Sequence, residues 1–374
     1  MKVFFITIAL LLNLLFVGLL VVSGLATYIS PEKLILPAYL GLFFLPLVFI
    51  NILFLFFWVV KLKWYFVFSL AVLVFSFNNF CNDFPFNGKA KNEFPAANDS
   101  SSISEVSLLS YNVKHFNFYK KDKQKEHFNE IVDYIIKRDA DIVCLQEFGY
   151  YNEKKFLSED DIMNMFSKKY PYRHIVYQYG TNEKNAYGVA TLSKYPIVKK
   201  QEMDYDSKFN RSIFSDIKIA GRRLRVFNCH LESNQLTHND RKRMAKLMDS
   251  TNQKNISETT EMLTRKLGFA YRKRAHQADL IAEAIRESPH SVVVCGDFND
   301  TPISYTYQTI RADLNDVFVN CSTGPGITYN ELPFLYRIDY ILCSNEIAAA
   351  RFKIDRVKFS DHYPISCVLR IEDE

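Results

Sequence analysis

The segment VVVCGDFND, residues 292–300, joins an apolar run to a polar turn and largely decides how the chain folds. Its β-branched residues, followed by a turn signal at Gly296, predict a buried β-strand. Asp297 and Asn299 come directly after that strand. Because a sheet presents the residues at its strand ends along one edge, we expect both polar side chains at such an edge.

Several other apolar runs also end in polar residues. Singly, such a residue is more often a strand cap or a turn residue. Together they supply carboxylates, an amide and imidazoles, which suit a hard divalent cation that leaves positions open for water and phosphate. Zinc fits poorly, because no thiolate pair or closely spaced histidine pair is present. The residues are Asn112 in LLSYNV, Glu147 in DIVCLQE, His230 in VFNCHLES, Asp339 in YRIDYIL, and Asp361 with His362 in FSDHYPI.

Short β-like runs alternate with helical segments after residue 105, which predicts a layered α/β or α+β domain over residues 105–374. The cysteines in or beside these runs show no zinc or disulfide spacing, so we expect buried free thiols. Those cysteines are Cys144, Cys229, Cys295, Cys343 and Cys367. Strands are expected at 106–113, 141–146, 187–192, 213–219, 224–229, 291–295, 338–342 and 365–371, with a helix near 125–137.

Residues 238–276 form a long polar interruption that predicts a basic insertion of two helices. They contain ten Lys or Arg and four acidic residues. Two interpretations remain open, a solvated helix surface or a basic lip that meets anionic lipid headgroups.

The first 80 residues differ in composition from the rest, because they hold only five charged side chains. Uncharged runs at 3–27, 34–60 and 64–80 predict a transmembrane anchor of about three helices, the third at the short limit for a span. The rival interpretation of the first run is a cleaved signal peptide, but that run is longer than a usual signal core and further apolar runs follow it.

The cations of the short loops predict the orientation of this anchor. Lys2, Lys61 and Lys63 are expected on the cytoplasmic side. With three spans, the chain then emerges after Phe80 on the extracytoplasmic face. Residues 81–104, rich in Asn, Ser and Pro, predict a linker. After residue 80 the chain holds 42 of its 46 basic and 40 of its 41 acidic residues, which excludes a strongly cationic nucleic-acid-coating domain.

The ordered set LQE, GDFN, RIDYIL and SDHYPI resembles the endonuclease/exonuclease/phosphatase superfamily, which is deoxyribonuclease I-like, over about residues 106–371. The resemblance implies a four-layer α/β sandwich whose two central sheets bring these loops together at one edge. It also implies Mg²⁺, or Mn²⁺, as the metal.

The resemblance assigns a role to each matching residue. Glu147 would be the principal metal ligand, with Asn112 and Asp361 nearby as metal or phosphate contacts. His362 would be the catalytic histidine, held in one tautomer by Asp339. Asp297 and Asn299 would orient the attacking water and bind the scissile phosphate, and His230 would donate to a phosphate oxygen or protonate the leaving group. Asn185 is similar to a phosphate-contacting asparagine of the family.

Three functions are consistent with this pattern. The first is a membrane-anchored, metal-dependent phosphoesterase acting on a phosphate ester, such as a phosphodiester in a phospholipid headgroup. The second is a surface nuclease for DNA or RNA, which the near-neutral charge and the lack of an identifiable aromatic stacking stripe disfavour. The third is an inactive binding scaffold on the same fold, which the chemically competent residues at every matched position disfavour.

Overall fold

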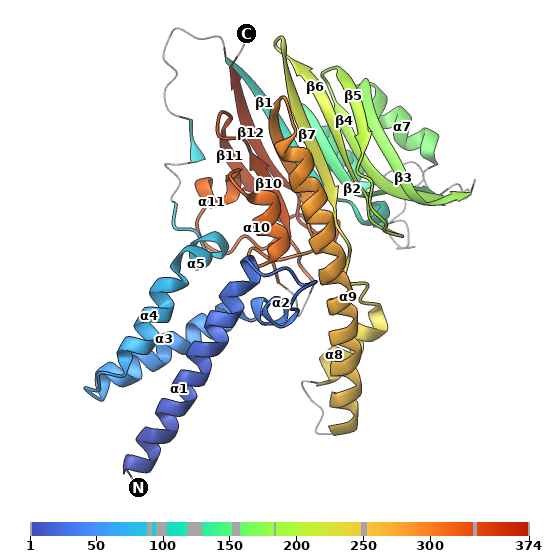
Figure 1. Cartoon of the computed structure of the whole chain (residues 1–374). Helices are drawn as coiled ribbons and strands as arrows, with labels where there is room; N and C mark the ends of the chain where they lie inside the picture. The colour runs from blue at the N-terminus through green and yellow to red at the C-terminus, as the bar shows by residue number, and fades with distance from the viewer. Residues whose placement is uncertain are drawn as a thin grey trace. The chain divides into compact units, whose positions relative to one another are not determined.

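The computed structural model describes residues 2–87, 92–94, 103–117, 129–151, 158–182, 185–247, 253–331 and 335–372 (Figure 1). The chain divides into two compact units. The first unit comprises Met1–Pro85, Asn234–Ala278 and Asp300–Ile310. The second unit comprises Phe86–Ser233, Asp279–Asn299 and Arg311–Glu374. The helices are α1 (Lys2–Gly24), η1 (Leu25–Thr27), α2 (Leu36–Gly41), α3 (Phe44–Val60), α4 (Phe66–Phe75), α5 (Phe77–Asp83), η3 (Lys114–Asn117), α6 (Glu130–Arg138), α7 (Glu159–Ser167), α8 (His238–Leu247), α9 (Gln253–Arg286), α10 (Tyr305–Arg311) and α11 (Val317–Cys321).

The second unit is built on two mixed six-stranded sheets, ordered β11-β12-β1-β2-β4-β3 and β5-β6-β7-β8-β10-β9. Each sheet contains one parallel pair, β1 with β2 and β7 with β8. The strands are β1 (Ile103–Asn112), β2 (Ile142–Tyr151), β3 (Tyr172–Asn182), β4 (Asn185–Ser193), β5 (Ile197–Glu202), β6 (Ser212–Ile219), β7 (Arg222–His230), β8 (Ser291–Asp297), β9 (Asn315–Asp316), β10 (Asp339–Cys343), β11 (Ala348–Ile354) and β12 (Ile365–Glu372).

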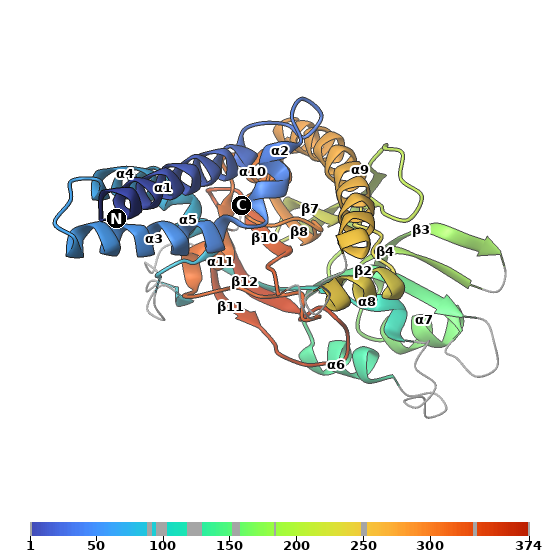
Figure 2. The ribbon, with the colours of Figure 1, turned by 90° about the horizontal axis from the view of Figure 1, so that it is seen from below.

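Successive side chains of β1 and β2 point to opposite faces of their sheet, and each face contributes to one apolar layer. Leu108 and Cys144 of the first sheet pack against Val226 and Val293 of the second, so the sheets face each other across a buried core. The opposite face of β1 and β2 packs against α6 and α7, which lie on the far side of that sheet from β7 and β8 (Figure 2). The end of α9 buries Ile281, and the expected four-layer sandwich is confirmed.

Strand direction explains why the polar strand ends share one edge. In the second sheet, His230 and Asp297 end the parallel strands β7 and β8, while Asp339 begins the antiparallel strand β10 and pairs with Asp297. In the first sheet, Asn112 ends β1, and Ser360, just before antiparallel β12, donates a hydrogen bond to the Asn112 carbonyl at 2.8 Å. Each sheet therefore delivers its polar residues to the same edge.

Gly296 allows β8 to approach β7 closely just before Asp297. Its φ is +133°, and a Cβ there would collide with the Cys229 carbonyl. We expect Gly296→Ala to lower the free energy of unfolding by about 2 kcal/mol or more, through backbone strain and overpacking. Thermal unfolding checks this against Gly18→Ala, whose Cβ would meet nothing within 4 Å. Equal melting temperatures for the two variants would show that the close approach is not required.

All eight expected strands form, and the polar segment 238–276 forms the two helices α8 and α9, although α9 continues to Arg286. The expected helix near 125–137 begins at Glu130, after the Asn129 side chain caps it; residues 118–128 lie outside the described part. All seven cysteines are free, and the five expected in strands are buried. The expected linker 81–104 is described only at 81–87, 92–94 and 103–104, and α5 extends into it to Asp83.

In the first unit, α1 with η1 makes one 26-residue helix, Lys2–Thr27, that is long and apolar enough to cross a membrane. The expected span 34–60 is divided into α2 and α3, and the expected span 64–80 is divided into α4 and α5, bent by 56° against each other. Among the described residues one helix, or two if the bent pair counts as one span, is long and apolar enough to cross a membrane, so the expected three spans are not supported. Pro37 and Pro46 lie in the first turns of α2 and α3. Proline lacks an N–H donor and is tolerated at helix starts, so the two prolines mark where new helices begin.

Buried polar side chains connect the apolar helices of this unit. Asn13 of α1 donates to Ser69 Oγ of α4 at 2.8 Å and accepts from Trp58 Nε1 of α3 at 2.9 Å. Asn51 of α3 donates to the Phe16 carbonyl of α1. Such contacts between apolar helices are typical of packed membrane segments.

Candidate active site

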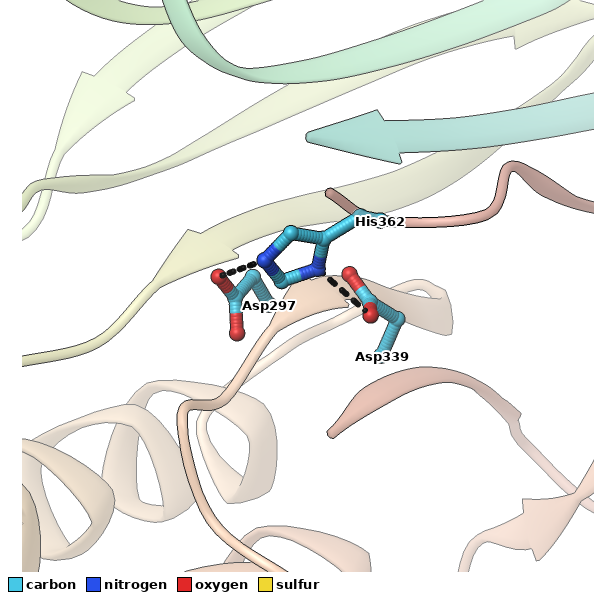
Figure 3. Close-up of side chains that lie close together, drawn as sticks. All are labelled: Asp297, Asp339 and His362. Atoms are coloured by element: carbon cyan, nitrogen blue, oxygen red, sulfur yellow. Dashed lines mark hydrogen bonds and ion pairs between the residues drawn. The ribbon is translucent and has the colours of Figure 1, made fainter. Parts of the chain in front are cut away.

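His362 lies between two carboxylates at the common edge of the sheets (Figure 3). Its Nδ1 is 2.9 Å from Asp339 Oδ2, and its Nε2 is 3.7 Å from Asp297 Oδ2. All three residues are buried, and one potential donor atom from each lies within 4.8 Å of the others. The residues come from the end of β8, the start of β10 and the loop before β12, so the fold has gathered positions 65 residues apart in the sequence.

Burial and neighbouring charges shift the pKa values of His362 and Asp297. Burial lowers the pKa of His362, but Asp339 and Asp297 raise it by more, to well above its usual value. Burial raises the pKa of Asp297, an effect that His362 opposes and Asp339 reinforces. His362 is therefore held as an imidazolium, while Asp297 is a carboxylate whose raised pKa brings it closer to neutral pH.

Replacing Asp339 with asparagine tests its expected role in fixing the ring. We expect kcat/KM to fall roughly 10²–10⁴-fold, because the imidazolium loses its orienting carboxylate. The alkaline limb of the pH profile should also move to lower pH, since Asp339 is the strongest influence that raises the pKa of His362. A uniform loss of activity with an unchanged pH profile would indicate a merely structural role.

Asn112 joins the two carboxylates that come from different sheets. Its Nδ2 donates to Glu147 Oε1 at 3.2 Å and to Asp297 Oδ2 at 3.0 Å. Glu147 has a φ of +49° and occupies a bulge where the pairing of β2 with β4 shifts register. A bulge redirects a side chain, and here it brings Glu147 toward Asn112.

Lys114 holds Asp361 at the same edge. The Lys114 ammonium is 2.5 Å from Asp361 Oδ2 and 3.2 Å from Glu331 Oε1. Burial raises the pKa of Asp361, but His362 and Lys114 lower it by more, so this carboxylate is charged. His115 Nε2 lies 3.3 Å from Glu147 Oε2. Both Lys114 and His115 follow Asn112 closely in the chain.

His230 is buried beside the same carboxylates, with Nε2 at 3.9 Å from Glu147 Oε1 and 3.8 Å from Asp297 Oδ2. Burial lowers its pKa to about 4, so the ring is neutral at neutral pH. The Asn210 amide nitrogen lies 2.9 Å from Nε2 and fixes the ring. Protonating a leaving group needs a charged ring, which this burial opposes.

The two remaining asparagines occupy the same edge in different ways. The Asn299 backbone N–H donates to Asp297 Oδ1 at 2.8 Å, and its side-chain amide donates to the Leu231 carbonyl at 2.9 Å. Through these two hydrogen bonds Asn299 connects the Asp297 carboxylate to the backbone that follows β7. Asn185 begins β4 and pairs with Tyr151 of β2, four residues beyond Glu147; its side chain lies outside the described part.

These donors fit a hard divalent cation. Glu147, Asp297 and Asp361 supply carboxylate oxygens, the ligand type that Mg²⁺ and Mn²⁺ prefer. Asn112 turns its amide nitrogen toward Glu147 and Asp297, while its Oδ1 accepts from the Lys114 backbone N–H at 3.1 Å. Glu147 and Asp297 share one amide donor, so like charges converge. Thiols are absent from these contacts among the described residues, which agrees with a hard ion rather than zinc.

Sequence reasoning missed the residues that hold the expected ones in place. Lys114, His115 and Asn210 act through contacts with Asp361, Glu147 and His230. The only signal in the sequence is closeness to a motif: NVKHF continues directly from Asn112. Asn210 gives no such signal, because its partner is 20 residues away and the contact depends on the turn before β6.

Comparison with solved structures shows distant likeness. An endonuclease/exonuclease/phosphatase family protein from Bacteroides thetaiotaomicron is 16% identical, with a TM-score of 0.49, and covers 72% of this chain and 99% of its own. Beta toxin from Staphylococcus aureus is 18% identical, with a TM-score of 0.46, and the match covers 70% of this chain and 99% of the toxin chain. A humanized D. rerio TDP2 is 14% identical, with a TM-score of 0.47, and the match covers 71% of this chain and 98% of the TDP2 chain. At these identities the likeness concerns the fold alone.

Comparison of the sequence with protein-family models identifies the family. No curated protein matches the sequence. A model for a domain of unknown function matches residues 2–82. The model of the Endonuclease/Exonuclease/phosphatase family matches residues 109–362, the range that contains all of the edge residues described above, and the chain therefore belongs to the endonuclease/exonuclease/phosphatase family.

Proposed function

We propose that the protein is a membrane-anchored, divalent-metal-dependent hydrolase of a phosphodiester, with a phospholipid headgroup as the favoured substrate. The observation that carries the proposal is the buried group of Asp297, Asp339 and His362, which Asn112 connects to Glu147. Buried charges of this kind are costly unless they serve binding or catalysis, and perturbed carboxylate and imidazole groups concentrate at functional sites.

The two halves of the reaction fall to different residues. Asp297 accepts a proton from the attacking water, since its raised pKa improves a carboxylate as a base near neutral pH. His362, as an imidazolium, donates a hydrogen bond from Nε2 to a phosphoryl oxygen, while Asp339 holds its Nδ1. Asn299 keeps Asp297 in position. His230 and Asn185 would lie against the bound phosphate.

Glu147, with Asn112 and Asp361, would hold the Mg²⁺ or Mn²⁺ ion. When bound, such an ion neutralises the phosphoryl oxygens and stabilises the leaving oxygen. Lys114 balances the charge of Asp361 and helps to keep that carboxylate ionised.

The anchor supports a substrate at the membrane. We assign residues 1–80 to the anchor, 81–104 to a linker and 105–374 to the catalytic domain, which emerges on the extracytoplasmic side. Tyr39, in the segment after α1, donates a hydrogen bond to the Thr264 carbonyl of α9 at 2.7 Å. This contact supports a topology in which the segment after α1 and the α9 arm lie on the same side of the bilayer.

Labelling of single cysteines by a membrane-impermeant maleimide tests the sidedness. In intact cells, Lys33→Cys should react, because it follows α1 on the outer side. Leu62→Cys, between Lys61 and Lys63, should react only after permeabilisation. The parent chain, whose Cys81 is half-buried, gives the background. Equal labelling of both positions in intact cells contradicts the proposed topology.

Direct assay of the purified full chain tests the reaction and separates it from a nuclease. We expect release of phosphocholine or another phosphorylated headgroup from phospholipid vesicles with Mg²⁺, and a rate lower by roughly 10²–10⁴-fold with His362→Ala. Plasmid cleavage without headgroup release would replace the lipid substrate by nucleic acid. Metal-dependent stabilisation without turnover on any phosphate ester would favour an inactive scaffold.

A further inference from the structure

The middle of α9 carries a local excess of positive charge. Residues 262–278 contain five Lys or Arg and no acidic residue. Two of these cations have structural partners: Arg274 is buried with its Nε 3.1 Å from Asp300 Oδ2, and Lys266 Nζ lies 2.7 Å from Asp240 Oδ2. The other cations of this stretch are Arg265, Arg272 and Lys273.

Arg265, Phe269 and Arg272 form what we call the basic-aromatic face of α9. Their spacing of four and three residues places them on one side of the helix. Both arginines are exposed, and Phe269 is 51% exposed. Lys273 Nζ lies 5.5 Å from the centre of the Phe269 ring, which adds positive charge beside the aromatic. Glu261, one turn before Arg265, is the nearest exposed acid on this side of the helix.

Contacts within the first unit fix this face near the end of the apolar helix α1. Tyr39 of α2 donates to the Thr264 carbonyl, and its ring meets Tyr271 edge-on with centroids 6.0 Å apart. A Cβ on Gly268 would require the Tyr39 hydroxyl to shift, so the Tyr39 side chain approaches α9 closely at this glycine. The basic-aromatic face therefore lies in the part of α9 that α2 contacts.

The segment between α1 and α2 has the character of a membrane interface. Tyr28 is 71% exposed, and Leu34 and Leu36 are each about half exposed. Exposed apolar and tyrosine side chains directly after a spanning helix are typical of the headgroup level of a bilayer. Arginines beside them have stems long enough to reach phosphate groups while an aromatic ring enters the interface.

We propose that the basic-aromatic face of α9 binds the anionic headgroups of the bilayer that α1 enters. The inference rests on the anchoring part of the proposed function and is independent of its chemistry. Binding would fix the arm formed by α8 and α9 against the membrane surface. A neutral bilayer lacks the charge that the two arginines require, so the interaction depends on lipid composition.

An environment-sensitive fluorophore on His276→Cys, one turn beyond Arg272, reports whether the face meets lipid. The full chain is reconstituted in nanodiscs of phosphatidylcholine, or of phosphatidylcholine with phosphatidylserine as about a third of the lipid. We expect a blue shift and quenching by lipid-borne quenchers only with phosphatidylserine. High salt should reverse both effects by screening the charges.

Charge reversal tests the two arginines against a matched control. Arg265→Glu and Arg272→Glu should each lower occupancy of the lipid-bound state about fivefold. The control is Lys218→Glu with Arg223→Glu, a cross-strand pair of exposed cations on β6 and β7, which should leave the fluorescence unchanged. Melting temperatures of both sets verify folding, and turnover of a soluble phosphodiester reports separately on the proposed chemistry.

Several outcomes overturn the proposal. Identical spectra in neutral and anionic discs, or effects of Arg265→Glu and Arg272→Glu no larger than that of the control variant, exclude specific binding of anionic lipid by this face. A spectral change caused by a single-stranded oligonucleotide, with none caused by phosphatidylserine, assigns the face to nucleic acid. Extraction of the parent chain from membranes at alkaline pH removes the anchoring on which the inference rests, even where soluble phosphodiester turnover persists.

Discussion

Replacement of His362 by alanine is expected to lower kcat/KM for phosphodiester hydrolysis by roughly 10²–10⁴-fold. The variant loses the imidazolium that lies 2.9 Å from Asp339 and 3.7 Å from Asp297, and with it the hydrogen-bond donor to the phosphoryl oxygen. Removal of the His362 charge, which lowers the pKa of Asp297, should also raise the pKa of that carboxyl further. Initial rates over a range of pH measure both effects.

A second histidine provides the matched control. His290 precedes β8, whereas Asp297 ends it, so His290 lies at the opposite end of the strand from the site. His290→Ala should retain parental turnover, and both variants should show the cooperative thermal unfolding of the parent. Parental activity in His362→Ala, with its fold intact, contradicts the assigned chemistry.

Replacement of Glu147 by glutamine is expected to weaken the apparent affinity for Mg²⁺ by at least about tenfold, since perturbing metal ligation typically costs this much or more. The change preserves the shape of the side chain, including an oxygen that can accept from Asn112 Nδ2, but removes the negative charge. Turnover at saturating metal should fall less than in His362→Ala. Activity and melting temperature, each measured against Mg²⁺ concentration, give the affinity in two independent ways.

An exposed glutamate controls for the loss of one negative charge. Glu346 lies in the turn between β10 and β11, and Glu346→Gln should leave the Mg²⁺ dependence unchanged. An unchanged metal requirement in Glu147→Gln would exclude this carboxylate as the principal ligand. The metal site would then be assigned to the group of Asp297, Asp339 and His362.

Much of the site's location follows from strand ends that the sequence displays. The runs VVVC, before Gly296 and Asp297, and IVCL, before Gln146 and Glu147, are apolar throughout because they lie between two packed layers, so their boundaries are sharp. The strands that were not expected, among them β3, β5 and β11, lie at the edges of the sheets, where exposed polar residues such as those of β5 interrupt the apolar pattern. Their weak pattern resembles that of a loop, and pairing with a neighbour decides their structure.

The geometry around each expected residue depends on contacts that no local pattern encodes. Glu147 reaches Asn112 from a bulge with positive φ, a conformation that glutamate rarely adopts alone. Lys114 and Asn210 meet their partners only once distant segments pack. Hydropathy likewise predicted the apolar runs of the first 80 residues, but the position of the break between α2 and α3 depends on prolines and packing.

The most direct test of the account is the rate of phosphodiester hydrolysis by the purified full chain, measured with Mg²⁺ and with a chelator, for the parent and for Asp297→Asn. We predict that parental turnover requires the metal and that Asp297→Asn reduces it by at least about 10²-fold while keeping the fold. Turnover that persists in the chelator, or an Asp297→Asn variant as active as the parent, contradicts the claim that these strand ends form one metal-dependent phosphoesterase site.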